Sequence, residues 1–223
     1  RDQTRSRGLV DVNKRQVLYT SGSTGTPKGV LLTHGGHLWA QKFRVTRAIN
    51  SSHHRLLVAA PLYHMNALCV LLFAFGINAT TVLLPQFSAE HYIAAVERFK
   101  CTWLTSVPTM LAICLADSKL IKGSDFSSVG VVRMGSAPVS PKLWGRVEET
   151  FPGASIMNGY GTTEAGPVVF SPKPGQVPPP LSVGWPSPDV RLKLIDDQGN
   201  ETEQGELWHY TPCLLYTSPS PRD

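Results

Sequence analysis

Short apolar runs of strand length alternate with longer segments of helical period through the first two thirds of the chain. Residues 80–84 and 129–134 are rich in β-branched and aliphatic side chains, whereas residues 88–99 repeat apolar side chains on one helical face. This alternation predicts an α/β fold with a largely parallel sheet covered by helices. The expected strands are residues 16–19, 55–60, 80–84, 102–105 and 129–134, and the expected helices are residues 33–48, 62–75, 88–99, 109–115 and 140–150.

Capping residues support three of these helices. Thr33, Ser88 and Ser140 each stand where a side-chain oxygen would accept a hydrogen bond from the first helical turn. Pro141 follows Ser140 at the first helical position, where proline is favoured. The Pro-Gly pair at residues 152–153 predicts that this last helix stops just before it.

The composition fits a soluble globular protein, with 42% hydrophobic and 17% charged residues. The net charge of +5 comes without a run of basic residues, so nothing marks a nucleic-acid or membrane partner. The most apolar stretch, residues 67–77, is shorter than the about 20 residues that span a bilayer, and it predicts a buried helix. The four cysteines show no metal-ligand spacing or disulfide framework, which favours a reducing, cytoplasmic location.

The pattern changes after Gly166. Prolines between residues 172 and 180 predict an extended, irregular segment. Strand-like residues 190–195 and 205–208 then flank a polar turn, which predicts an antiparallel β region toward the C-terminus. Residues 213–223 read CLLYTSPSPRD, and we interpret them as non-native cloning or adaptor sequence, with a natural disordered tail as the alternative.

A loop rich in glycine and hydroxyl side chains, LYTSGSTGTPKGV at residues 18–30, follows the first expected strand. Glycines let the backbone turn tightly and bring its N–H groups close to phosphate oxygens, and Lys28 adds positive charge. The ordinary phosphate-loop pattern is not met, because Lys28 precedes Gly29 rather than a hydroxyl residue. By composition alone, a flexible surface loop is an equal alternative.

Two further segments carry polar chemistry. Residues 158–164, NGYGTTE, combine an aromatic face, flexible glycines, hydroxyls and a carboxylate, which suit a base, a phosphate and a magnesium ion. Residues 135–138, GSAP, follow an expected strand, where small side chains leave room for a ligand at the edge of the sheet. Taken alone, a polar turn and a tight turn are the alternatives for these two segments.

The string YTSGSTGTPKG resembles the phosphate loop of the adenylate-forming superfamily, which includes acyl-CoA synthetases, firefly luciferases and peptide-synthetase adenylation domains. The NGYGTTE segment is similar to the YGxTE motif of the same family. The resemblance covers about residues 16–208, after which the family's TGD motif and small C-terminal domain are missing. We therefore expect an internal fragment of the large N-terminal domain. Its expected parts are a truncated lead-in at 1–15, an α/β nucleotide- and acyl-binding part at 16–170 and a β-rich part at 171–212.

The resemblance also implies roles for individual residues. Tyr160 would lie against adenine, Thr163 would contact the α-phosphate, and Glu164 would bind Mg²⁺. His64, in a segment that resembles the wall of the acyl tunnel, would orient the substrate carboxylate, although packing within an apolar helix is the alternative. The expected catalytic residues are Lys28, His64, Thr163 and Glu164. The expected nucleotide-binding residues are Thr20, Ser21, Gly22, Ser23, Thr24, Gly25, Lys28, Gly135, Ser136, Ala137, Pro138, Asn158, Gly159, Tyr160, Gly161, Thr162 and Thr163.

The function implied by the resemblance is an acid–CoA ligase. It would use ATP and Mg²⁺ to convert a fatty or aromatic carboxylic acid to acyl-AMP and then transfer the acyl group to coenzyme A. The fragment itself is expected to be inactive. Adenylation for another acceptor, luciferase-like oxidation and a non-catalytic nucleotide-binding fragment stay open. An amino-acid substrate is disfavoured, because Tyr63 and His64 stand where peptide synthetases carry a Phe-Asp pair that binds the ammonium group.

Overall fold

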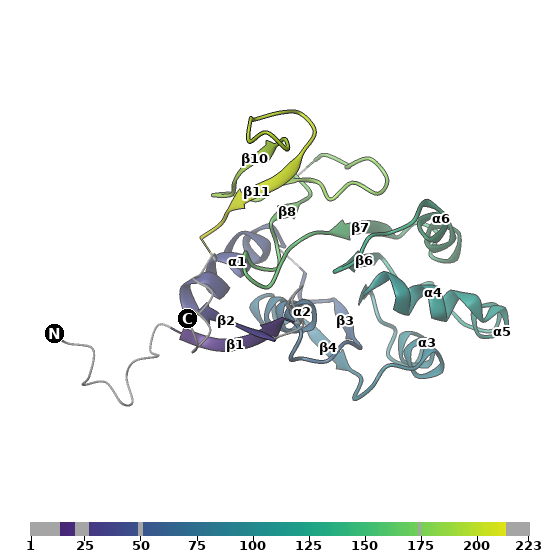
Figure 1. Ribbon diagram of the computed structural model, residues 1–223. Helices are drawn as coiled ribbons and strands as arrows, with labels where there is room; N and C mark the ends of the chain where they lie inside the picture. The colour runs from purple at the N-terminus through teal and green to yellow at the C-terminus, as the bar shows by residue number, and fades with distance from the viewer. Residues whose placement is uncertain (1–13, 21–26, 49–50, 174, 213–223) are drawn as a thin grey trace, which may run out of the picture.

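The computed structural model describes residues 14–20, 27–48, 51–173 and 175–212 (Figure 1). Its centre is a five-stranded parallel sheet in the order β4-β3-β5-β6-β7. This sheet confirms the predicted α/β class. The strands are β3 (Arg55–Val58), β4 (Thr80–Leu83), β5 (Trp103–Ser106), β6 (Val131–Gly135) and β7 (Ser155–Gly159).

Helices connect the parallel strands and cover both faces of the sheet. They are α2 (Met65–Gly76), α3 (Ala89–Arg98), α4 (Pro108–Ala116), α5 (Ser118–Lys122) and α6 (Pro141–Thr150). The larger apolar cluster joins the sheet to α3, α4 and α6, and a smaller one joins it to α2. Alternation along β3 divides its side chains between them, because Leu57 packs in the larger cluster and Leu56 and Val58 pack in the smaller.

The three predicted helix caps are all present. Thr33 Oγ1 accepts a hydrogen bond from the Gly36 N–H at 2.9 Å at the start of α1 (His34–Arg47). Ser88 and Ser140 accept equivalent bonds, each at 3.2 Å, at the starts of α3 and α6. Helix α6 ends at Thr150, as the Pro-Gly pair predicted.

A β-hairpin precedes α1. Strand β1 (Lys14–Thr20) pairs antiparallel with β2 (Lys28–Thr33), and Thr20 lies opposite Lys28. Strand β2 was not predicted, because its first residues were assigned to the loop. It is held by Val30 and Leu32, which are buried with Leu18 and with Met65 of α2. The glycine-rich loop therefore connects the two strands of this hairpin.

Two small antiparallel sheets follow the parallel one. Strand β8 (Phe170–Ser171) pairs with β9 (Trp185–Pro186), and β10 (Arg191–Ile195) pairs with β11 (Glu206–Tyr210). The predicted antiparallel region toward the C-terminus is thus confirmed, and Figure 1 shows the β10–β11 hairpin beyond the edge of the parallel sheet. Across the described ranges, no helix combines the length and apolar character needed to cross a membrane.

Candidate active site

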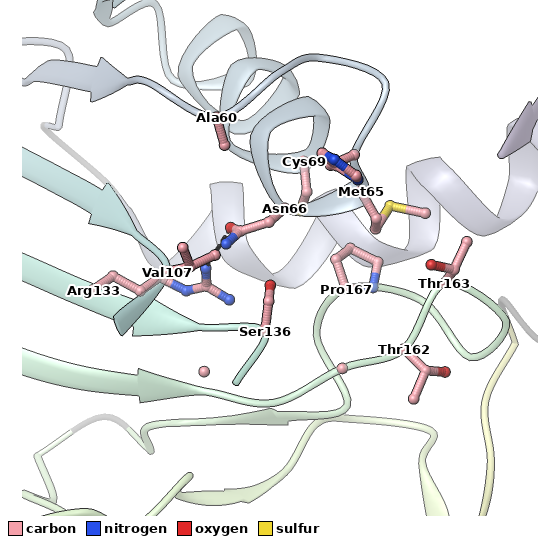
Figure 2. A pocket seen from close by; sticks show the side chains of 13 residues that line it. Ala60, Met65, Asn66, Cys69, Val107, Arg133, Ser136, Thr162, Thr163 and Pro167 are labelled. Atoms are coloured by element: carbon pink, nitrogen blue, oxygen red, sulfur yellow. Dashed lines mark hydrogen bonds between the residues drawn. The ribbon is translucent and has the colours of Figure 1, made fainter. Parts of the chain in front are cut away.

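A cavity of about 410 Å³ lies at the carboxyl ends of the parallel strands. Residues at or within two positions of the ends of β3, β5, β6 and β7 contribute to its wall, together with the start of α2. Ligands bind at this edge in open α/β sheets, because the loops that leave successive strands converge there. The wall includes Ala60, His64, Met65, Asn66, Cys69, Val107, Arg133, Ser136, Gly159, Gly161, Thr162, Thr163 and Pro167 (Figure 2).

An adjoining cavity of about 290 Å³ is shared by the two motifs that the sequence singled out. Ser136, Ala137 and Pro138 line one part of it, and residues 158–161 line another. Ser136, Gly159 and Gly161 line both cavities, so the two spaces lie next to each other. The strands β6 and β7 that carry these motifs pair directly, with Gly135 opposite Gly159.

Close packing explains two of the glycines. A Cβ atom on Gly161 would lie 2.6 Å from the carbonyl oxygen of Gly166, which is closer than Cβ atoms approach other heavy atoms in proteins. A Cβ atom on Gly159 would lie 2.4 Å from Nη2 of Arg133. The small residues in this motif therefore make room for the neighbouring backbone and for a guanidinium group.

Tyr160 is supported by aromatic neighbours. Its ring makes edge contacts with Phe170 of β8, at 5.6 Å between centroids, and with His209 of β11, at 6.3 Å. Its backbone oxygen accepts a hydrogen bond from the Val169 N–H at 3.2 Å. These contacts come from the small antiparallel sheets, so the C-terminal part of the chain positions this ring beside the cavity.

Two hydrogen bonds stabilise the segment that follows Tyr160. Thr162 Oγ1 accepts a hydrogen bond from the Ala165 N–H at 2.9 Å. The carbonyl oxygen of Ala165 accepts another from the buried hydroxyl of Thr211, at 2.6 Å. Thr162 and Thr163 line the larger cavity, whereas the partly buried Glu164 lines neither of the two.

His64 lies at the N-cap position of α2, and its ring is 4.7 Å from that of Tyr63. The residue is exposed and lines the larger cavity. This position favours a role toward a ligand over the alternative of packing within the apolar helix.

Arg133 is a residue of the cavity that sequence analysis missed. It lies in β6, and its Nη1 donates a hydrogen bond to Oδ1 of Asn66 at 3.1 Å (Figure 2). Burial, and then the positive charge of Arg44, lower the pKa of Arg133 to about 10, so the group stays cationic at neutral pH. A lone arginine within the apolar run VVRMG offers no spacing signal, and its hydrogen-bond partner is set by how α2 packs on the sheet.

The glycine-rich loop, which resembles a phosphate loop, is described at its two ends. Thr20 ends β1, and the backbone of Lys28 begins β2. Ser21, Gly22, Ser23, Thr24 and Gly25 lie outside the described residues, as does the side chain of Lys28. Their predicted contacts with ATP stay predictions. The hairpin is joined to the cavity through Met65, which packs with Leu18, Val30 and Leu32 and also lines the wall.

The residues present are compatible with Mg²⁺ held mainly by a nucleotide. No cluster of three or more His, Cys, Asp or Glu residues that could hold a metal ion occurs in the described ranges. Mg²⁺ is usually bound through one or two carboxylates together with substrate phosphates, rather than by an all-protein cage. A lone carboxylate such as Glu164 fits that kind of site.

The sequence profile of AMP-binding enzymes matches residues 15–216. The chain is 31% identical over 207 residues to 4-coumarate–CoA ligase-like 9 from Arabidopsis thaliana, a match that covers 89% of this chain and 37% of that protein. It is 34% identical over 192 residues to a feruloyl-CoA synthase from Amycolatopsis, covering 85% of this chain and 38% of that one. The chain therefore spans less than two fifths of the length of these relatives.

Solved structures agree with this result. The anthranilate–CoA ligase AuaEII in complex with anthranoyl-AMP has a TM-score of 0.79 at 25% identity, with 91% of this chain and 40% of that one covered. The o-succinylbenzoate–CoA synthetase of Bacillus subtilis in complex with ATP and a magnesium ion has a TM-score of 0.72 at 27% identity, with 89% and 41% covered. By sequence and by fold, the chain belongs to the family of AMP-binding, adenylate-forming enzymes.

Proposed function

We propose that the protein containing this chain is an AMP-forming acid–CoA ligase. The observation that carries the proposal is the convergence of residues 136–138 and 158–163, which belong to separate motifs, on two adjoining cavities at the carboxyl edge of the sheet. The names of the similar proteins, which include CoA ligases for coumarate, ferulate and anthranilate, support this activity and favour an acid with an aromatic ring over a fatty acid.

The reaction has two balanced steps. A carboxylate oxygen of the acid attacks the α-phosphorus of ATP, and pyrophosphate leaves to give the acyl-adenylate. The thiol of coenzyme A then attacks the acyl carbon, releasing AMP and a proton and forming the thioester. Fixed positive groups lower the barrier of the first step, because negative charge grows on the leaving pyrophosphate. We assign that role to Lys28 and to the N–H groups of the glycine-rich loop.

The remaining roles follow from position around the two cavities. Tyr160, on the smaller cavity, would stack on adenine, and Thr163, on the larger one, would contact the α-phosphate. His64 would donate a hydrogen bond that orients the substrate carboxylate. Mg²⁺, which Glu164 would help to hold, supplies charge neutralisation at the phosphates when bound.

Carboxylate-dependent exchange of pyrophosphate into ATP tests the adenylation step in the full-length protein. We expect exchange with aromatic acids. In Lys28→Ala the rate of exchange should fall by about 100-fold, the usual effect of removing one group that stabilises a developing charge. Lys42→Ala, which alters an exposed lysine on α1, is the matched control and should keep wild-type activity.

Three other results would change the assignment. Exchange followed by transfer to an acceptor other than coenzyme A would show a different adenylating enzyme. Light emission or oxidation of the adenylate would show a luciferase-like reaction. Absence of exchange with every acid, alongside intact ATP binding, would refute the ligase and favour a nucleotide-binding role.

A further inference from the structure

The direction of the Arg133 side chain follows from its place in β6. Its neighbours Val132 and Met134 are buried in the apolar cluster that joins the sheet to α3, α4 and α6. Because side chains alternate along a strand, Arg133 points to the opposite face, toward α1 and α2. A cationic group therefore lies on the side of the sheet that carries the smaller apolar cluster.

The polar partners of Arg133 are neutral. Asn66 of α2 accepts one hydrogen bond at 3.1 Å, whereas a guanidinium carries five N–H donors. Among the residues that the structure describes, no carboxylate forms an ion pair with Arg133. A partly buried charge without a counter-ion is costly, and an anionic group that binds beside it removes much of that cost.

A second guanidinium raises the positive potential at the same place. Arg44 of α1 lies over the ring of Phe73, at 4.4 Å from the centroid, and donates to Sγ of Cys69 at 2.8 Å. Cys69 lines the larger cavity beside Asn66 and Arg133. The hydrogen-bond acceptors described for Arg44 are likewise uncharged. Two cations with neutral partners thus flank this end of the cavity.

Arg133 also stands between two cavities. It lines the larger cavity and a further one of about 280 Å³, whose wall includes Arg44, Phe73 and Trp103. Figure 2 shows Arg133 and Asn66 on one side of the larger cavity, with Thr162 and Thr163 on the other. An acid whose reacting carboxylate lies next to an α-phosphate held at Thr163 would therefore direct its far end toward Arg133.

We propose that Arg133 binds a second carboxylate at the far end of the substrate, so that the natural substrate is a dicarboxylic acid. The inference rests on the proposed function. Arginine suits this role because its planar donors match a carboxylate in a bidentate arrangement. A long alkyl chain, in contrast, would have to pass a charged group and strip it of polar contacts, so the same residue disfavours fatty acids.

The test compares acids that differ in their far end, by pyrophosphate exchange with the full-length protein. In the first pair 4-carboxycinnamic acid is compared with cinnamic acid, and in the second adipic acid is compared with hexanoic acid. A further acid, 4-hydroxycinnamic acid, carries an uncharged hydroxyl group at its far end. We expect each diacid to exceed its monoacid in kcat/KM by about 10- to 100-fold, the range of a hydrogen bond between charged groups.

Substitution of Arg133 identifies the residue responsible. In Arg133→Gln the ratio of diacid to monoacid should fall to about 1, and Arg133→Lys should retain part of it, because a charge remains without the fork of donors. Arg98→Gln, which alters an exposed arginine on α3, should keep the wild-type ratio. A ratio measured within one variant is insensitive to loss of folded protein.

Different failures have different meanings. Exchange that is equal or better with the monoacids, or best with 4-hydroxycinnamic acid, would overturn the dicarboxylate inference and leave the ligase in place. An unchanged ratio in Arg133→Gln would overturn it as well. Absence of exchange with all acids would refute the proposed function and the inference together. If Arg133→Gln does not fold, the wild-type ratios still test the preference for diacids, and a ratio in Arg133→Lys equal to that of wild type would overturn the assignment to Arg133.

Discussion

A Cβ atom on Gly159 would lie 2.4 Å from Nη2 and 2.7 Å from Cζ of Arg133. The guanidinium thus occupies the space that any side chain at residue 159 would need. Strands β6 and β7 are paired in parallel through this region, with Arg133 opposite Met157 and Gly135 opposite Gly159. The conformation of the cavity arginine therefore depends on a glycine in the neighbouring strand.

Replacing Gly159 with alanine should displace Arg133 and break its hydrogen bond to Asn66. The clash is with the end of a flexible side chain, so we expect a loss of about 1 kcal/mol in the free energy of unfolding, at the low end for overpacking. Under the dicarboxylate proposal, the preference for diacids should fall several-fold, as measured by pyrophosphate exchange. Gly145→Ala is the control, since its Cβ would have no neighbour within 4 Å in helix α6. An unchanged preference in Gly159→Ala would contradict the expectation.

Alanine at Gly161 should be more damaging to stability than alanine at Gly159. Its Cβ would meet the carbonyl oxygen of Gly166 and the carbonyl carbon of Pro167, each at 2.6 Å. Backbone atoms yield less readily than a long side chain, so we expect a loss of about 3 kcal/mol. Urea unfolding of both variants gives the comparison. Equal midpoints for the two would show that the backbone near residue 166 can move.

Thr211→Val should loosen the segment that follows Tyr160. The buried hydroxyl of Thr211 donates to the carbonyl oxygen of Ala165 at 2.6 Å, and valine keeps the shape while removing the donor. Leaving that buried oxygen unpaired should cost about 1–3 kcal/mol of stability. ATP affinity, measured by titration calorimetry, should fall as well, because this contact links β11 to the cavity wall. Thr109→Val, at an exposed site on α4, is the control. Equal ATP affinity in the two variants would show that the contact between Thr211 and Ala165 does not support the nucleotide site.

Much of the fold could be predicted from local sequence. Helices α1, α3 and α6 start at the predicted caps, because a hydroxyl before an apolar-periodic segment is a local signal. Helix α5 was not predicted, since five residues are too few to show a period. The strand order β4-β3-β5-β6-β7 could not be derived either, because it depends on contacts between distant segments.

The candidate site divides in the same way. The motifs at residues 135–138 and 158–164 could be recognised from the sequence, and the structure brings residues 136–138 and 158–163 to adjoining cavities. Arg133 belongs to no recognisable motif, and its place in the cavity wall depends on the helices that pack over β6. Asn66 is similar, because it lies two residues after His64 and no pattern in the sequence predicts its hydrogen bond to Arg133. Residues whose function depends on tertiary neighbours are those that sequence patterns miss.

Glu164→Gln should raise the Mg²⁺ concentration that the adenylation step requires. Under the proposed function, loss of this carboxylate weakens metal binding while leaving the nucleotide phosphates as ligands. We expect the Mg²⁺ concentration at half-maximal exchange to rise by about 10- to 100-fold, the cost of losing a residue that supports a metal site. Glu149→Gln, on the exposed side of α6, is the matched control. Equal Mg²⁺ dependence in both variants would remove Glu164 from the proposed metal site.

Stability should fall at alkaline pH because buried groups keep their protons. Burial raises the pKa of the Cys101 thiol to about 11 and that of the Cys114 thiol to about 12, both from an ordinary value of 9.0. The unfolded chain loses these protons first, so the stabilisation is complete below about pH 9 and declines as the pH rises through the native pKa values. Each thiol contributes a slope of up to about 1.4 kcal/mol per pH unit. Urea midpoints measured with reductant from pH 8 to 11 should therefore decrease, and less steeply in Cys114→Ala. Parallel slopes for wild type and Cys114→Ala would show that this thiol is not a source of the alkaline loss.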